Sequence, residues 1–138
     1  MNIEECHQFQ LYLLTLNLLM MKEQILPENC DEWCVNATII NRAYYSSYLY
    51  CLLWLNEVKK FKPKAPWEFK KMEKRIGEHK QVRDALYCFG KEKVKKELND
   101  LASLRKKADY DPSSNLSLKE VNSAIEHMEE IFKQLEFQ

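Results

Sequence analysis

The stretch from Asp31 to Lys60 most constrains what this chain can fold into. If this stretch is a helix, its mostly apolar side chains form two stripes, which lie on different sides of the helix. The stripes are Ile40, Tyr44, Ser47, Cys51, Trp54 and Val58, and Val35, Thr38, Arg42, Tyr45, Leu49 and Leu52. A helix that is apolar nearly all round is typically surrounded by protein. We therefore expect a long central helix here, with one stripe available to face a partner subunit.

The rest of the chain also predicts helices. Only two glycines and four prolines occur among 138 residues, and no segment alternates apolar and polar residues with the period of a strand. We expect one all-α domain over residues 1–138, an up-and-down bundle of four long helices plus one or two short ones. The other expected helices cover roughly residues 3–24, 67–76, 78–89, 91–108 and 117 onward. The expected inner face of the first is Leu11, Leu14, Leu18, Met21 and Ile25.

Two signals predict the ends of the last helices. Asp111-Pro112 should end the helix over 91–108, because a residue before proline avoids the α region. Ser117 and Glu120 have the spacing of a capping box, which predicts that the last helix begins there.

The charge is balanced overall but uneven along the chain. The segment from Lys59 to Lys107 holds 17 of the 21 basic residues and only 7 of the 21 acidic ones. Its lysines include Lys70, Lys71 and Lys74, close to the aromatic Trp67. Lysines grip phosphates and rings stack on bases, so this is the best candidate nucleic-acid patch. The alternative is that Trp67 and Phe69 fix a short helix to the bundle and the lysines are solvated.

The five cysteines have no disulfide-framework or zinc-site spacing, which favours reduced thiols, no bound metal and no cofactor. The apolar run from Phe9 to Met21 is too short to cross a bilayer. Glu4 and Glu5 precede it where a signal peptide carries positive charge. We expect a cytoplasmic protein that does not enter a membrane.

Arg105 stands where the helical pattern asks for a hydrophobe. It continues the apolar face of Val94, Leu98, Leu101 and Ala108. A guanidinium keeps its charge and is costly to bury without partners. Two interpretations follow: an ion pair with Asp109 that holds the helix end, or a cation that meets a ligand phosphate. Arg42 raises the same question on the central helix.

Two further residues are candidates for acid–base chemistry. His79 has an unperturbed pKa of about 6.5 and lies in the most basic stretch, although capping a short helix or pairing with a carboxylate would also explain it. Tyr110, with an unperturbed pKa of about 10, is a poor base but could orient a phosphate or donate a proton. Packing of its ring is the simpler explanation.

Three stretches together resemble HEPN-domain proteins. Residues 41–48 (NRAYYSSY) resemble the RAYYAAFHA-like segment of their second helix, and residues 103–111 (SLRKKADYD) resemble the RxxADY end of a later long helix. Residues 77–82 (GEHKQV) resemble a short GxHKxV element between those helices. The order and spacing match over nearly the whole chain.

The resemblance implies a homodimeric helical bundle that acts on RNA in a toxin–antitoxin or anti-phage system. Many family members are metal-independent endoribonucleases whose Arg-x4–6-His motifs meet across the dimer. Arg105 matches the motif arginine, but Tyr110 takes the place of the histidine. Under this hypothesis Arg105, Asp109 and Tyr110 form the site, with Arg42 and Tyr45 nearby and His79 as a weaker catalytic candidate.

The resemblance also leaves a second hypothesis open. The chain could be a non-catalytic interaction module whose partner is a nucleotidyltransferase or another defence protein. In some family members such a partner modifies a tyrosine near the motif with AMP, and Tyr110 would be the corresponding residue here.

Overall fold

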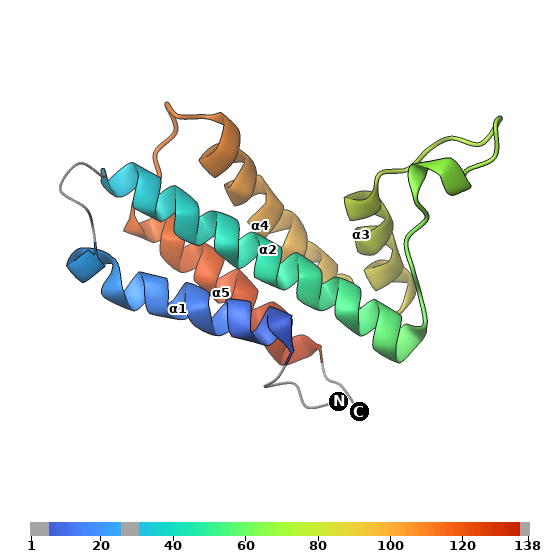
Figure 1. Ribbon diagram of the computed structural model, residues 1–138, viewed down its shortest axis with the longest axis horizontal. Helices are drawn as coiled ribbons and strands as arrows, with labels where there is room; N and C mark the ends of the chain where they lie inside the picture. The colour runs from blue at the N-terminus through green and yellow to red at the C-terminus, as the bar shows by residue number, and fades with distance from the viewer. Residues whose placement is uncertain (1–5, 26–30, 136–138) are drawn as a thin grey trace.

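A computed structural model describes residues 6–25 and 31–135, which form five α-helices and no strand (Figure 1). The helices are α1 (His7–Ile25), α2 (Glu32–Lys59), α3 (Glu78–Cys88), α4 (Glu92–Tyr110) and α5 (Leu118–Gln134), and one 3₁₀ turn covers Pro66–Glu68. The predicted all-α bundle is confirmed. The expected start of the first helix near residue 3 lies outside the described residues.

Helix α2 is the centre of the bundle, as its two stripes predicted. It packs against each of the other four helices. Its first stripe is buried from Ile40 to Trp54 and ends at Val58, which is partly exposed. The second stripe is half-buried or exposed, and Arg42 on it is exposed. Asp31 caps the helix by accepting a hydrogen bond from the backbone N–H of Cys34 at 2.8 Å.

The end of α4 and the start of α5 follow the sequence signals closely. Helix α4 extends to Tyr110, two residues beyond the expected end, and stops before Pro112. Ser117 caps α5, with its backbone N–H donating to Glu120 Oε2 at 2.8 Å. Two side chains of α2 form hydrogen bonds with the loop between α4 and α5. Trp33 Nε1 donates to the carbonyl of Ser114 at 3.1 Å, and Asn36 Nδ2 donates to the carbonyl of Leu116 at 2.6 Å.

The predicted inner face of α1 is wrong in part. Leu14 and Met21 are 51% and 44% exposed, whereas Thr15 is fully buried. Aromatic packing orients this helix, because the Tyr12 ring stacks on Phe132 of α5 with centroids 4.5 Å apart. The helix is apolar on every side, so residue spacing alone could not single out the buried face. The side chain of Ile25 lies outside the described part of the chain.

The helix predicted over residues 67–76 does not form. After the turn at Pro66–Glu68 the chain is irregular, with only a tight turn in which Glu73 N donates to the Lys70 carbonyl at 2.9 Å. Trp67 and Met72 are 83% and 94% exposed. A helix this short is marginal without an apolar face to bury, and this segment buries none. Residues 60–77, hereafter the arm, instead loop outward beyond α3 (Figure 1).

Candidate functional site

Arg105 lies between the end of α4 and the first half of α2, beside an open groove. Its side chain is 20% exposed, and its neighbours Leu101 and Ala108 on the same face are buried. The residues that line the groove come from both helices. They are Trp33, Cys34, Ala37, Thr38, Asn41, Arg42, Ala108, Asp109 and Tyr110.

The predicted Arg105–Asp109 pair is present. Arg105 Nε lies 2.8 Å from Asp109 Oδ2, and the Asp109 side chain is 22% exposed. No acceptor among the described residues lies in line with the Nε–H bond, so the contact is ionic rather than a well-directed hydrogen bond. Asp109 is shared, because Asn41 Nδ2 lies 3.1 and 3.3 Å from its two carboxylate oxygens.

Three tyrosine rings surround the guanidinium of Arg105. Its Cζ lies 5.4 Å from the ring centroid of Tyr44, 5.3 Å from that of Tyr45 and 5.7 Å from that of Tyr110. Nη2 also donates to the Tyr45 hydroxyl at 3.0 Å. Aromatic faces attract a guanidinium, so the rings hold the cation in place without neutralising it. Tyr110 itself is 72% exposed.

The structure brings His79 close to this cluster from α3. His79 Nδ1 is hydrogen-bonded to the Tyr44 hydroxyl, and its ring stacks on Tyr48 with centroids 4.0 Å apart. The Tyr48 hydroxyl donates to Glu78 Oε1 at 2.9 Å. Tyr44 therefore separates His79 from Arg105, with one tyrosine ring in contact with both.

Burial and nearby cations set the protonation states here. Burial lowers the pKa of His79 below its usual value, and the positive charges of Arg105 and Arg83 lower it further against the opposing effect of Glu78. Burial raises the pKa of Tyr44 to about 12. At neutral pH this leaves a neutral imidazole, which can accept a proton, beside a protonated phenol.

The sequence-predicted residues thus fall into three groups. Arg105 is in direct contact with both Asp109 and Tyr45, and Asp109 lines the groove together with Arg42 and Tyr110. His79 joins them through Tyr44, not through a carboxylate or a helix cap as its simpler interpretations required.

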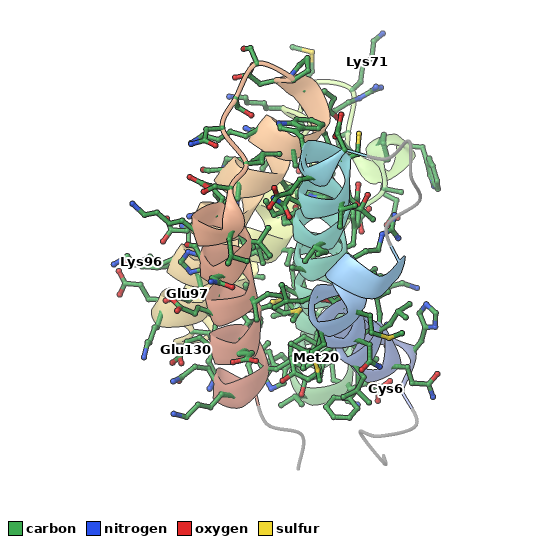
Figure 2. All side chains as sticks on the ribbon, turned by 90° about the vertical axis from the view of Figure 1, so that its left-hand side faces the viewer. Cys6, Met20, Lys71, Lys96, Glu97 and Glu130 are labelled. Carbon is green, nitrogen blue, oxygen red and sulfur yellow. The ribbon has the colours of Figure 1, made fainter. Side chains whose placement is uncertain are left out.

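Lys70, Lys71, Lys74 and Trp67 form the third group, on the arm. Figure 2 shows Lys71 at one end of the molecule, away from Glu97 and Glu130. With its indole 83% exposed, Trp67 does not fix the arm to the bundle, and the alternative interpretation of it as a packing residue is wrong.

Sequence reasoning missed Asn41 and Tyr44. Both lie within the NRAYY segment, but helical spacing places Tyr44 in an apolar stripe and gives no sign of its hydroxyl contact. It also assigned no partner to His127, which is hydrogen-bonded to Glu97. Only the packing of α2 against α3 and α4, and of α4 against α5, reveals these contacts.

No group of three or more His, Cys, Asp or Glu side chains in residues 6–25 and 31–135 is placed to hold a metal ion. Within the same ranges no helix has both the length and the apolar character needed to cross a bilayer.

Comparisons with protein-family models, with curated proteins and with solved structures found no match to this chain.

Proposed function

We propose that this chain is a HEPN-type homodimeric protein that binds RNA, with Arg105 meeting a backbone phosphate, in a toxin–antitoxin or anti-phage system. The observation that supports this most is the state of Arg105. The cation is fixed by three rings and Tyr45, its ion pair with Asp109 is poorly directed, and Asp109 lines an open groove together with Arg42. A guanidinium in that setting can fork onto phosphate oxygens.

Cleavage would use the same phosphate. Metal-free RNA cleavage needs a base for the 2′-hydroxyl proton, a cation for the charge that develops on the phosphorus oxygens, and an acid for the leaving oxygen. Arg105 supplies the cation. His79 is a weaker candidate for the base: its lowered pKa keeps it neutral, but Tyr44 lies between it and Arg105. Tyr110 can donate a proton from the groove.

The test compares wild type with Arg105→Ala and Lys106→Gln. Lys106 is exposed on the next position of α4 and serves as a control for the loss of one charge. We expect Arg105→Ala to weaken binding of a structured RNA at least tenfold at low salt and to lower the salt slope by about 0.7, the value for one phosphate contact on a single strand. Lys106→Gln should change affinity less than threefold.

Two results would contradict the proposal. One is equal loss of affinity in both variants, which would mean that only net charge matters. The other is failure of folded wild-type protein to bind or cut RNA at low salt. Urea denaturation of each variant verifies that Arg105→Ala remains folded.

A second candidate function is a non-catalytic module for a protein partner such as a nucleotidyltransferase. The exposed Tyr110 favours it, because a hydroxyl at the groove is open to modification by AMP. In that reaction the tyrosine oxygen would attack the α-phosphate of ATP, releasing pyrophosphate and a proton. The test is mass spectrometry after incubation with ATP and the nucleotidyltransferase encoded beside this chain, if the neighbouring reading frame encodes one. Tyr110→Phe should abolish the added mass, while Arg105→Ala should lower stability without changing RNA affinity.

A further inference from the structure

A second hollow lies on the molecule, between the arm and α2. Its volume is about 420 Å³, within the range of roughly 300–1,000 Å³ found for small-molecule sites. The walls are mostly apolar, and their apolar side chains are Leu52, Phe61, Pro63, Ala65, Pro66, Trp67 and Ile76. None of these residues belongs to the groove beside Arg105.

The arm is held in place by hydrogen bonds although it lacks a long helix. Gln81 of α3 accepts from the backbone N–H of Lys64 at 2.8 Å and donates to the carbonyls of Lys64 and Ile76 at 3.0 and 2.8 Å. The Gln81 side chain therefore holds the arm at Lys64 and at Ile76, two residues that line the hollow. Glu68 stabilises the turn that carries Trp67 by accepting from the backbone N–H of Ala65 at 3.0 Å.

The charge around the hollow suits a polyanion. From Lys59 to Arg75 the chain has eight basic and two acidic residues. Both acidic side chains are occupied, since Glu68 accepts from Ala65 N and Glu73 accepts from Lys70 N at 3.1 Å. Glu73 also pairs with Lys64 at 3.4 Å, but the excess of six basic residues over acidic ones still makes this stretch strongly positive. Lys62 and Lys64 line the hollow itself.

The hollow also indicates which part of a polyanion would enter it. Trp67 presents an indole that is 83% exposed, whereas Trp54 is buried and Trp33 is half-buried. An exposed ring is a platform on which a base can stack, worth about 1–3 kcal/mol per base. Glu78 and Asn56 also line the hollow and offer hydrogen bonds to the edge of a base. A carboxylate there repels phosphate, so the base enters and the phosphates remain on the lysines.

We infer that this hollow holds one unpaired base of single-stranded RNA, stacked on Trp67, with the adjoining phosphates on Lys62 and Lys64. The inference rests on the proposed function and names its substrate class, RNA with unpaired nucleotides. In a duplex the bases are already paired and stacked, so they cannot enter such a hollow.

The experiment uses an oligouridylate of eight nucleotides, whose bases stack weakly on one another, with one 2-aminopurine, a base whose fluorescence falls when it stacks on a ring. The full chain is tested as wild type, Trp67→Ala and Met72→Ala. Met72 is 94% exposed on the same arm and does not line the hollow, so its substitution is the matched control. We expect quenching with wild type and Met72→Ala, loss of quenching with Trp67→Ala, and at least fivefold weaker binding of the single strand by Trp67→Ala.

A matched duplex provides the second arm of the experiment, and its affinity should be the same for wild type and Trp67→Ala. The inference is overturned if Trp67→Ala and Met72→Ala behave alike, or if duplex and single strand lose affinity equally. Arg105→Ala separates this inference from the proposed function. Retained quenching in Arg105→Ala, with unchanged affinity for structured RNA, would support the stacking site and contradict the role proposed for Arg105.

Discussion

Replacing Asp109 with asparagine should move stability and RNA affinity in opposite directions. The substitution keeps the shape of the side chain and an oxygen that can accept from Arg105, but it removes the carboxylate charge. The pair is 20% and 22% exposed, so it lies between exposed pairs, worth about 0.2–1 kcal/mol, and buried pairs, whose disruption costs about 3–5 kcal/mol. We therefore expect the free energy of unfolding to fall by about 1–2 kcal/mol.

RNA affinity should rise in the same variant. A phosphate that meets Arg105 also approaches Asp109, whose Oδ2 lies only 2.8 Å from Arg105 Nε. Two like charges about 4 Å apart repel by about 1 kcal/mol in water. Removing that repulsion corresponds to about fivefold tighter binding at low salt, and the gain should shrink as salt screens it.

Urea denaturation measures the first effect and fluorescence anisotropy of a labelled RNA, at several salt concentrations, measures the second. Asp84→Asn is the matched control, because Asp84 pairs with Lys80 at 2.8 Å with the same helical spacing but away from the groove. It should change stability by less than 1 kcal/mol and affinity by less than twofold. Unchanged or weaker binding by Asp109→Asn would refute the idea that a phosphate meets Arg105.

Three further predictions concern the scaffold around the site. The pKa of His79 is lowered in the folded state, so as the pH falls the unfolded chain binds a proton at this residue before the folded chain does. Below about pH 6.5 His79 should therefore reduce the free energy of unfolding, until it is protonated in the folded state too. Urea titrations between pH 5.5 and 7.5 should show a smaller pH dependence for His79→Gln than for wild type. Asn36→Ala should cost about 1–3 kcal/mol in chemical denaturation, because it leaves the Leu116 carbonyl without its 2.6 Å donor; a cost near zero would mean that water replaces the amide. Met128→Ala should cost about 2–5 kcal/mol by the same measurement, since Met128 is fully buried and its removal leaves a cavity.

The parts of the fold that followed from sequence are those where local and tertiary preferences agree. Helix α5 has a cap at Ser117, and its start was predicted from the capping-box spacing. Helix α2 was predicted from its two stripes of mostly apolar side chains, and the first stripe is buried from Ile40 to Trp54. The segment around Trp67 and Met72 failed because its composition tolerates a helix but supplies no face for the bundle to bury. Tertiary packing decides such segments.

Residue spacing predicted the candidate site only along one helix, whereas the resemblance also placed Tyr45 nearby, and its hydroxyl accepts from Arg105 Nη2. Helical spacing alone brought Arg105 and Asp109 together, since residues four apart on a helix are neighbours. The contacts of Asn41 with Asp109 and of Tyr44 with His79 join residues 68 and 35 positions apart in the chain. No periodicity encodes contacts over such distances, so the position of His79 beside the Arg105 cluster became apparent only from the packing of α3 against α2.

Cys34 lines the groove, so the rate at which its thiol is alkylated can report whether the groove is occupied. Its thiol is exposed beside the groove, that of Cys88 is exposed on α3, and that of Cys51 is buried with a raised pKa. The thiolate is the nucleophile that attacks an alkylating reagent, so the buried Cys51 should not be labelled until the bundle unfolds. A molecule that occupies the groove would slow labelling of Cys34 and leave Cys88 unaffected. Occupancy of the groove could then be followed by mass spectrometry on the unaltered chain.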